Sequence, residues 1–543
     1  MSASLATSDR PRLLDALEER PFDLVVVGGG ITGAGILREA SLRGLSAALL
    51  EAEDFASGTS SRSSKLIHGG LRYLALGDVA LVRETALERK RVFALAPHLA
   101  ERCWMVVPAR SWAGLLKFRA GIGTYEKLGA VEAADRHFHW NADELARFEP
   151  ALRRDAWRFA CVYREYLTED ARLVLANLRA ALRRGGLAAN HAAVEGFLEQ
   201  DGRAAGVLAR CRLTGRELRV RARCVVNAAG PWIEALRRLE DPQAPSVLHL
   251  SKGVHVSLPA ERLPVRHIVI VNTSDKRSMF VIPRGDVVYV GTTDTSYGRG
   301  ADVWPEVERA DVEYVLEPLS RYFDVPKPSA EDVVAAWAGI RPLIAQPGRS
   351  PSEISRRDEI WIGPKRVVTI AGGKLTGYRR MAEEVMERVA RVLERPLPPP
   401  ADEDSPLPGG DFDGDLDALA ARLVTQTGVE APAAARLVRL YGTEAAAVVG
   451  LGATPLLPGS KVLSGEVDWA VGEEAAASLE DLIYRRTRVA LYDPLARETL
   501  LAPAAARMAA LLGWDAARRE REIADTRGRL ERDLGFARAT RGG

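Results

Sequence analysis

The start of the chain alternates between short apolar runs and one amphipathic stretch. Residues 23–27 form a β-branched run that predicts a strand, and the glycines at 28–30 break it. Apolar positions at helical spacing then predict a helix over about 32–43. A second apolar run at 46–50 predicts another strand, which ends at Glu51. The pattern therefore predicts one strand–turn–helix–strand unit.

The rest of the chain divides into a loop, a mixed middle and a helical end. Residues 54–70 are rich in Ser, Thr and Gly and predict a long functional loop, and residues 79–96 predict an amphipathic helix. Further strands are expected at 223–227, 254–257, 279–282, 287–290 and 366–371, and a helix at about 376–393. A Pro-rich stretch at 395–408 is the clearest boundary, and the Ala-, Leu- and Arg-rich residues beyond 411 have helical periodicity.

Composition and charge argue against several classes of protein. The chain has 543 residues and a formal net charge of +2, so it is large enough for two or three domains and lacks the charge typical of a nucleic-acid partner. Its four cysteines form no C-x-x-C pair and its histidines form no H-E-x-x-H motif, so we expect no metal site and reduced thiols. No run approaches the roughly 20 apolar residues of a spanning helix, and residues 1–20 lack the apolar core of a secretory signal. We therefore expect a cytoplasmic enzyme.

The first glycines carry the first chemical signal. Gly28-x-Gly30-x-x-Gly33 follows a predicted strand and opens a predicted helix, which is the context of a dinucleotide-binding fingerprint. Gly28 allows the tight turn, Gly30 lets a pyrophosphate approach the backbone, and Gly33 lets the helix pack on the strand. The helix N-terminus then presents free N–H groups to the phosphates. Glu51 is placed to accept hydrogen bonds from the ribose hydroxyls.

Two later strand-to-glycine breaks favour FAD over NAD. They lie at 227–230 and 371–373, far along the chain from the first turn. FAD is longer than one mononucleotide fold can hold, so returning segments must cover its flavin end. An NAD enzyme would more often confine the cofactor to one contiguous domain.

Residues 59–73 (T-S-S-R-S-S-K-L-I-H-G-G-L-R-Y), together with the N-terminal fingerprint, make a more specific match. They resemble the FAD-dependent glycerol-3-phosphate dehydrogenases of the membrane-associated respiratory type. Other matching stretches follow in order between about 20 and 500: D-A-R-L-V-L-A-N at 170–177, V-N-A-A-G-P-W at 226–232, K-G-V-H at 252–255, G-T-T-D at 291–294, G-I-R-P-L at 339–343, G-G-K-L-T-G-Y-R at 372–379 and R-R-T-R at 485–488.

The resemblance implies an α/β fold with three parts. A Rossmann-like FAD-binding domain (20–395) is interleaved with a mixed-sheet substrate domain (about 100–220 and 245–345). A Pro-rich linker (396–410) then leads to an all-helical C-terminal domain (411–543).

The resemblance also implies substrate and catalytic residues. Arg72 and Arg341 are expected at the phosphate of sn-glycerol 3-phosphate, because a guanidinium fork matches a doubly charged phosphate. His255, Lys374 and Tyr73 could accept the hydroxyl proton or hold a developing alkoxide. We rank His255 as the base and Lys374 as its electrostatic partner, and a purely structural His255 stays open.

The expected FAD contacts share one feature, namely a position in a glycine-rich turn, in the serine loop or at the start of the last helix of the FAD domain. They are Gly28, Gly30, Gly33, Glu51, Ser60, Ser61, Ser64, Lys65, Leu66, His68, Gly69, Gly70, Leu71, Gly230, Trp232, Gly339, Gly373, Lys374, Leu375 and Thr376.

The electron acceptor is not encoded in these motifs. The resemblance implies quinone and a peripheral position on the inner face of the cytoplasmic membrane, where the arginine-bearing tail and residues such as Leu511, Leu512 and Trp514 could contact lipid. An oxygen-using glycerophosphate oxidase, another flavin oxidase, or a non-catalytic flavin-binding protein are the alternatives. The sequence leaves a homodimer open.

Overall fold

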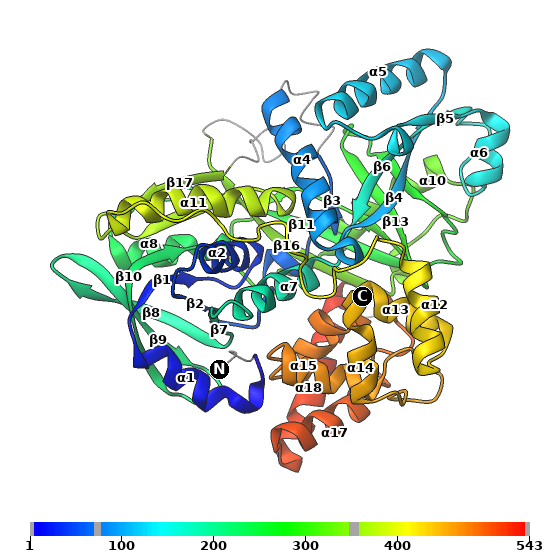
Figure 1. The fold of residues 1–543 in the computed structure, drawn as a ribbon. Coiled ribbons are helices and arrows are strands. Elements are labelled where there is room, and N and C mark those ends of the chain that lie inside the picture. The colour runs from blue at the N-terminus through cyan, green and yellow to red at the C-terminus, as the bar shows by residue number, and fades with distance from the viewer. Residues whose placement is uncertain (1–4, 70–77, 347–357, 538–543) are drawn as a thin grey trace.

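The computed structural model describes residues 5–69, 78–346 and 358–537. Within these ranges the chain forms two sheets and a helical region (Figure 1). The predicted fold class is confirmed: a Rossmann-like sheet and a mixed sheet lie beside a C-terminal helical part.

The first sheet has eight described strands and carries the nucleotide-binding unit. Its central order is β17 (Asp358–Ile362), β18 (Val368–Gly372), β10 (Glu217–Asn227), β1 (Phe22–Val27), β2 (Ala47–Leu50) and β7 (Leu187–Ala189), and β8 (Ala192–Gln200) and β9 (Arg203–Cys211) extend from β10. Strand β1 runs parallel to both neighbours, and its residues are buried on both faces apart from Asp23. Helix α2 (Ile31–Leu42) packs between α7 (Asp170–Leu182) and α11 (Tyr378–Leu393), while α1 (Arg10–Glu19) and α8 (Ile233–Glu240) contact the β8–β10 side.

The second sheet has ten described strands and is mostly antiparallel. Its order is β15 (Thr295–Ser296), β11 (Leu248–Pro259), β14 (Val287–Gly291), β13 (Ser278–Arg284), β12 (Ile268–Asn272), β4 (Glu101–Ala109), β6 (Phe159–Leu167) and β3 (Leu66–Ile67), with β16 (Ala335–Ile344) on β11 and β5 (Phe138–Trp140) on β6. Its helices are α4 (Val79–Leu95), α5 (Trp112–Leu128), α6 (Ala142–Phe148), α9 (Arg309–Leu316) and α10 (Leu319–Tyr322).

The expected limits of the substrate segments differ from this topology. Strands β7 to β10 belong to the first sheet, so the chain leaves the second sheet after β6, earlier than the expected 220. The cause is that β10 pairs in parallel with β1, which makes β10 part of the first sheet. Strand β9 forms a hairpin with β10 and therefore belongs to the first sheet as well.

The helical region comprises α12 (Leu416–Thr427), α13 (Ala431–Tyr441), α14 (Ala445–Leu451), α15 (Ser464–Glu473), α16 (Val489–Tyr492), α17 (Leu501–Leu512) and α18 (Ala516–Asp533). It shares a core with the second sheet, because Tyr163 and Trp337 belong to the same buried apolar cluster as Val467 and Met508. Among the described residues, no helix has both the length and the apolar character needed to cross a bilayer.

Candidate functional site

The turn after β1 is built so tightly that two of its glycines admit no side chain. Gly28 has a φ of +112°, and a Cβ there would lie 2.6 Å from the Ala228 carbonyl oxygen. A Cβ at Gly33 would lie 1.9 Å from the Gly28 carbonyl oxygen. These contacts bring β1, β10 and α2 together and leave the start of α2 next to the turn. The cradle fits the pyrophosphate of a dinucleotide.

Glu51 is fixed against the same turn. One carboxylate oxygen accepts the Gly29 N–H at 2.6 Å, and the other accepts the Glu53 N–H at 2.9 Å. Burial raises the pKa of Glu51 above its ordinary value. Its position at the end of β2 is the place from which a carboxylate reaches the ribose of a bound nucleotide.

The serine loop lies across the start of α2. The Ser60 hydroxyl accepts the Ile31 N–H at 2.9 Å, so it occupies the helix end where a phosphate would bind. Lys65 behaves differently: its Nζ is buried on the Ser61 carbonyl at 2.8 Å and on Asp170 at 3.1 Å. Burial lowers the pKa of Lys65 to about 7. The side chain therefore holds the loop onto α7.

The returning segments meet this loop. The Thr376 hydroxyl accepts the His68 N–H at 3.3 Å and donates to the His68 carbonyl at 3.2 Å. Burial, and then the charge of Lys374, lower the pKa of His68 to about 3. A Cβ at Gly339 would lie 2.8 Å from Arg62, so β16 packs directly on the loop.

Three other predicted residues flank the cradle. Gly230 has a φ of +55° in the turn after β10, and the Trp232 ring lies about 3 Å from where a Cβ on Gly58 would be. Gly373, with a φ of +81°, precedes the turn at Leu375–Gly377. The structure thus brings together the segments around 28–33, 51, 60–69, 230–232 and 373–376.

His255 sits in the second sheet between two cross-strand neighbours. Gly291 on β14 and Trp337 on β16 are its register partners. A Cβ at Gly291 would lie 2.1 Å from the His255 ring, and Trp337 stacks on the other side with ring centroids 5.0 Å apart. Gly291 therefore makes the room that the imidazole occupies.

The environment of His255 keeps its ring neutral. Burial, followed by the charges of Lys65 and Arg341, lowers its pKa well below the ordinary value. Nε2 is 2.9 Å from the Ser64 hydroxyl, whereas the buried Nδ1 has no hydrogen-bond partner among the described residues. A neutral imidazole can take up a proton. Because Ser64 belongs to the serine loop, the same contact ties this side chain to the cofactor cradle.

The side chain of Arg341, a residue of β16, lies over the same face of β11 as His255. A Cβ at Gly253 would be 2.3 Å from Nη2 of Arg341, so the guanidinium crosses the strand at that glycine. Gly253 and His255 are two residues apart on β11 and therefore share a face. The Arg341 guanidinium over Gly253 thus lies beside His255. The stretches K-G-V-H and G-T-T-D thus supply two glycines that accommodate two functional side chains.

A second guanidinium, which the sequence analysis missed, lies next to Arg341. Asp294 pairs with Arg341 at 3.3 Å and with Arg277 at 3.2 Å, and it accepts the Ser251 hydroxyl. Arg341 also donates to the Thr292 hydroxyl at 3.0 Å. No motif marks Arg277, because its position depends on the turn between β12 and β13. Asp294 thus holds two guanidiniums side by side, and guanidiniums are the side-chain groups best suited to bind a phosphate.

Four predicted site residues, Gly70, Leu71, Arg72 and Tyr73, lie outside the described residues. Their roles stay predictions.

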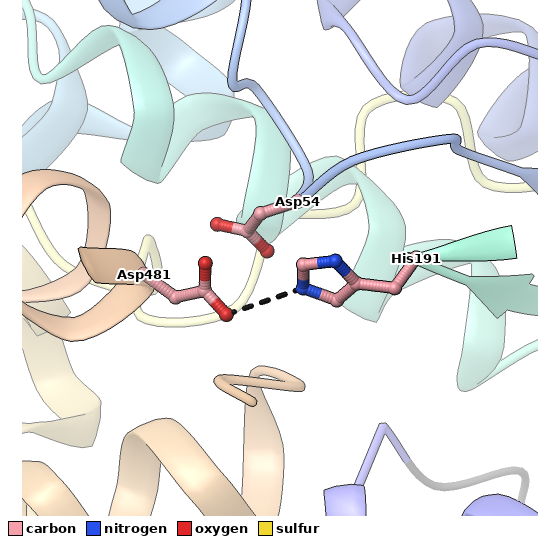
Figure 2. A group of neighbouring side chains, drawn as sticks. All are labelled: Asp54, His191 and Asp481. Carbon is pink, nitrogen blue, oxygen red and sulfur yellow. Dashed lines mark hydrogen bonds and ion pairs between the residues drawn. The ribbon is translucent and has the colours of Figure 1, made fainter. Parts of the chain in front are cut away.

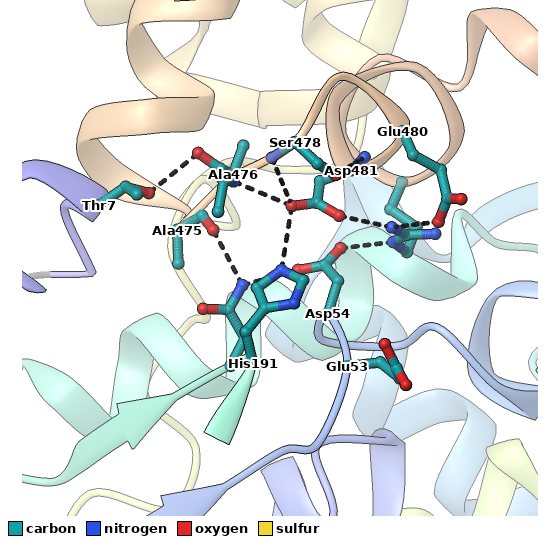
Figure 3. Close-up of polar contacts among 12 residues, drawn as sticks. Thr7, Glu53, Asp54, His191, Ala475, Ala476, Ser478, Glu480 and Asp481 are labelled. Atoms are coloured by element: carbon teal, nitrogen blue, oxygen red, sulfur yellow. Dashed lines mark hydrogen bonds and ion pairs between the residues drawn. The ribbon is translucent and has the colours of Figure 1, made fainter. Parts of the chain in front are cut away.

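A buried ion-pair network anchors the cofactor loop to the helical region. Asp54 lies in the loop after Glu51 and is held by Arg485 and Arg486, and Asp481 holds Arg485 at 2.7 Å. Asp481 also pairs with His191 at 3.3 Å, with Asp54 close to both (Figures 2 and 3). Burial would raise the pKa of Asp54, but the network lowers it, with Arg486 as the largest opposing contribution. Asp54, His191 and Asp481 could geometrically surround a metal ion, yet the guanidiniums already neutralise their charge. The cluster therefore has a structural role: it holds the loop after Glu51 against the helical region.

Comparison with known proteins finds relatives over most of the chain. The family described as FAD dependent oxidoreductase matches residues 23–378, and the C-terminal domain of alpha-glycerophosphate oxidase matches residues 402–519. Aerobic glycerol-3-phosphate dehydrogenase of Bacillus subtilis is 35% identical over 511 residues, which cover 91% of this chain and 92% of the relative. The enzyme of the same name from Staphylococcus haemolyticus is 37% identical over 453 residues, 81% of each chain.

Among solved structures, glycerol-3-phosphate dehydrogenase from Bacillus halodurans complexed with FAD aligns with a TM-score of 0.81. It is 31% identical and the alignment covers 98% of this chain and 99% of that one.

Proposed function

This chain belongs to the FAD-dependent oxidoreductase family, and we propose that it oxidises sn-glycerol 3-phosphate to dihydroxyacetone phosphate. The observation that carries the proposal is the position of His255 and Arg341 on one face of β11, joined through Ser64 to a dinucleotide cradle. In these roles the two residues would put a base and an anion site next to the cofactor site. The relatives named above, which carry that activity in their names, support it.

Substrate binding rests on charge. A phosphate monoester carries nearly two negative charges, and Arg341 and Arg277 offer two guanidiniums that Asp294 already orients. Each of these side chains is 23% exposed, so each is shielded yet reachable. Arg72 is proposed to complete this anion site.

His255 is the proposed base. Bound FAD would accept the hydride from C2 of the substrate, while His255 removes the proton from the hydroxyl on the same carbon. The two losses together convert the secondary alcohol to a ketone. The approach of the phosphate dianion offsets the charges of Lys65 and Arg341 and so raises the proton affinity of the imidazole. Lys374, at the cradle beside His68, is proposed to stabilise negative charge on the substrate oxygen or on the cofactor.

The test is anaerobic mixing of the flavin-loaded protein with sn-glycerol 3-phosphate while flavin absorbance is followed. We expect the flavin band to bleach and dihydroxyacetone phosphate to form in equal amounts. If the loaded protein does not bleach, the assignment fails. Under air, stoichiometric peroxide without an added acceptor would instead identify the oxygen-using alternative.

Quinone is the proposed acceptor, which requires a peripheral position on the inner face of the cytoplasmic membrane. Support comes from a surface at α5, β5 and α6, which lie together far from α17 (Figure 1). There Trp112 is 49% and Leu116 48% exposed, and Phe138 and Phe148 are also exposed. Lys117 lies beside them in the exposed part of α5. Exposed aromatic and aliphatic side chains beside basic residues are typical of a helix on anionic lipid.

The expected lipid contact by the C-terminal tail has less support. Leu512 and Trp514 pack against the core shared with the second sheet, and Leu511 is 38% exposed. We expect the double variant Trp112→Ser, Leu116→Ser to lose at least tenfold in binding to vesicles containing anionic phospholipid. Leu495→Ser removes a 90% exposed leucine elsewhere and serves as control. Equal loss in the control, or none in the double variant, would contradict the α5 assignment.

A further inference from the structure

The backbone of residues 68 and 69 is held by elements that belong to both sheets. The N–H and the carbonyl of His68 both bond to the Thr376 hydroxyl, which lies in the turn before α11 on the side of the first sheet. Gly69 is bonded instead by Tyr125 on α5 and Thr85 on α4, two helices of the second sheet. Both residues of this short segment are expected FAD contacts, so the bonds that fix them bear on cofactor binding.

The Tyr125 hydroxyl is the centre of a closed hydrogen-bond network. It accepts the Gly69 N–H at 3.0 Å and an Arg89 N–H at 2.7 Å, and it donates to a Glu165 carboxylate oxygen at 2.6 Å. A hydroxyl donates one hydrogen bond and accepts two. All three places are therefore filled, and because two of the partners are donors, the phenolic proton goes to Glu165.

The two charged residues keep the hydroxyl in this orientation. Arg89 also donates to the second carboxylate oxygen of Glu165 at 2.6 Å. Arg89 is 3% exposed, Tyr125 is fully buried and Glu165 is 1% exposed, so water does not replace a contact that is lost here. A buried ion pair adds little net stability, because the cost of desolvation offsets its attraction. This pair does orient a hydroxyl that bonds to both of its members.

The approach of the tyrosine to the backbone depends on glycine. A Cβ at Gly69 would lie 2.3 Å from the Tyr125 hydroxyl oxygen, so a larger residue would displace the phenol. On the other side of the same residue, the Thr85 hydroxyl lies 2.9 Å from the Gly69 carbonyl oxygen and 2.7 Å from the Leu81 carbonyl oxygen. The hydroxyl has one proton for these two acceptors. The Thr85 contact is therefore the weaker of the two that hold Gly69.

We propose that Tyr125 is a positioning residue for the flavin cofactor. Its hydroxyl, oriented by Arg89 and Glu165, holds the Gly69 amide and so places the backbone of residues 68–69 for the contact with FAD that the sequence predicts. A backbone that is already in place loses less conformational freedom when the cofactor binds. The inference concerns the cofactor, so it goes beyond the oxidation of glycerol 3-phosphate and does not depend on the identity of the substrate.

Release of FAD from the purified holoenzyme on dilution, followed by flavin fluorescence, tests the proposal without turnover. Tyr125→Phe keeps the ring and removes the acceptor of the buried Gly69 N–H. We expect the dissociation constant of FAD to rise about tenfold. Tyr163→Phe is the matched control, because Tyr163 packs edge-on against Tyr125 in the same buried cluster, with ring centroids 6.5 Å apart. It should bind FAD as the wild type does.

Thr85 supplies a second pair of variants on the carbonyl side of Gly69. Thr85→Val keeps the shape of the side chain and removes its hydroxyl, so it should weaken FAD binding in the same direction but less, because that proton is shared. Thr85→Ser keeps the hydroxyl and should bind FAD as the wild type does. This pair decides the question if Tyr125→Phe does not fold.

A purely structural role for Tyr125 predicts a different result. The variant would then lower the melting temperature by the same amount with and without FAD and leave the dissociation constant unchanged, which would overturn the proposal. Equal weakening of FAD binding in Tyr163→Phe would overturn it too. If instead the FAD affinities change as expected while glycerol 3-phosphate fails to bleach the flavin, the proposed function is wrong and this inference stands.

Discussion

Adding one methyl group at Gly253 tests the placement of Arg341 without removing its charge. A Cβ there would lie 2.3 Å from Nη2, 2.6 Å from Cζ and 2.7 Å from Nη1 of Arg341, whereas ordinary contact begins at 3.4 Å. The guanidinium must therefore move by about 1 Å, the scale on which misplaced groups cost up to a hundredfold in rate or affinity. Its hydrogen bonds to the Thr293 carbonyl at 3.1 Å and the Thr292 hydroxyl at 3.0 Å would stretch or break.

The predicted consequence is a weaker hold on the substrate phosphate. A hydrogen bond to a charged group contributes about 1.5–3 kcal/mol, so the Gly253→Ala variant should raise KM about ten- to a hundredfold. The limiting rate should change much less, because neither His255 nor the cradle moves. The fold should tolerate the variant, since the clashing atoms end a flexible side chain.

Steady-state kinetics with an artificial electron acceptor measure both parameters. Gly298→Ala is the control, because a Cβ there meets no atom within 4 Å. An unchanged KM in folded Gly253→Ala, or a fall in kcat alone, would refute this placement of the phosphate.

Three other variants test separate parts of the account. Gly291→Ala would push a Cβ to 2.1 Å from the His255 ring and should lower kcat at least tenfold in the same assay, with KM less affected; normal kcat would contradict the role of that ring. Asp54→Ala removes the carboxylate partner of buried Arg486 and one of the partners of Arg485, which keeps Asp481, and should lower the free energy of urea unfolding by about 3–5 kcal/mol. Glu53→Ala, with its half-exposed pair, should cost less than about 1 kcal/mol. Burial raises the pKa of Asp533 to about 6 from 3.8, so the folded state binds this proton more tightly than the unfolded state. The free energy of unfolding should therefore fall by on the order of 3 kcal/mol as pH rises from about 4 to above 6. Asp533→Asn should flatten the change in melting temperature across that range, and an unaltered slope would exclude this burial effect.

Local patterns predicted the elements well where neighbours in the sequence determine the structure. The strand, turn and helix around 23–43 appear as β1 and α2 within a residue or two, because apolar spacing and the glycines act over a few residues. The helix predicted at 79–96 appears as α4, Val79–Leu95, for the same reason.

Contacts between distant segments were beyond local patterns. The stretch R-R-T-R at 485–488 stood out through resemblance alone, and its partners Asp54 and Asp170 lie more than 300 residues earlier. Likewise, the need for glycine at 253 and 291 becomes visible only when β11, β14 and β16 are paired. The atoms that a Cβ would meet at these positions belong to side chains on neighbouring strands.

Rapid anaerobic mixing of flavin-loaded His255→Asn with sn-glycerol 3-phosphate measures whether His255 takes the hydroxyl proton. We expect the limiting rate of flavin bleaching to fall about 10²- to 10⁴-fold, because the base is lost. The substrate concentration at half-maximal rate should stay nearly unchanged, because the anion site is kept. Bleaching at the wild-type rate would show that His255 takes no proton from the substrate.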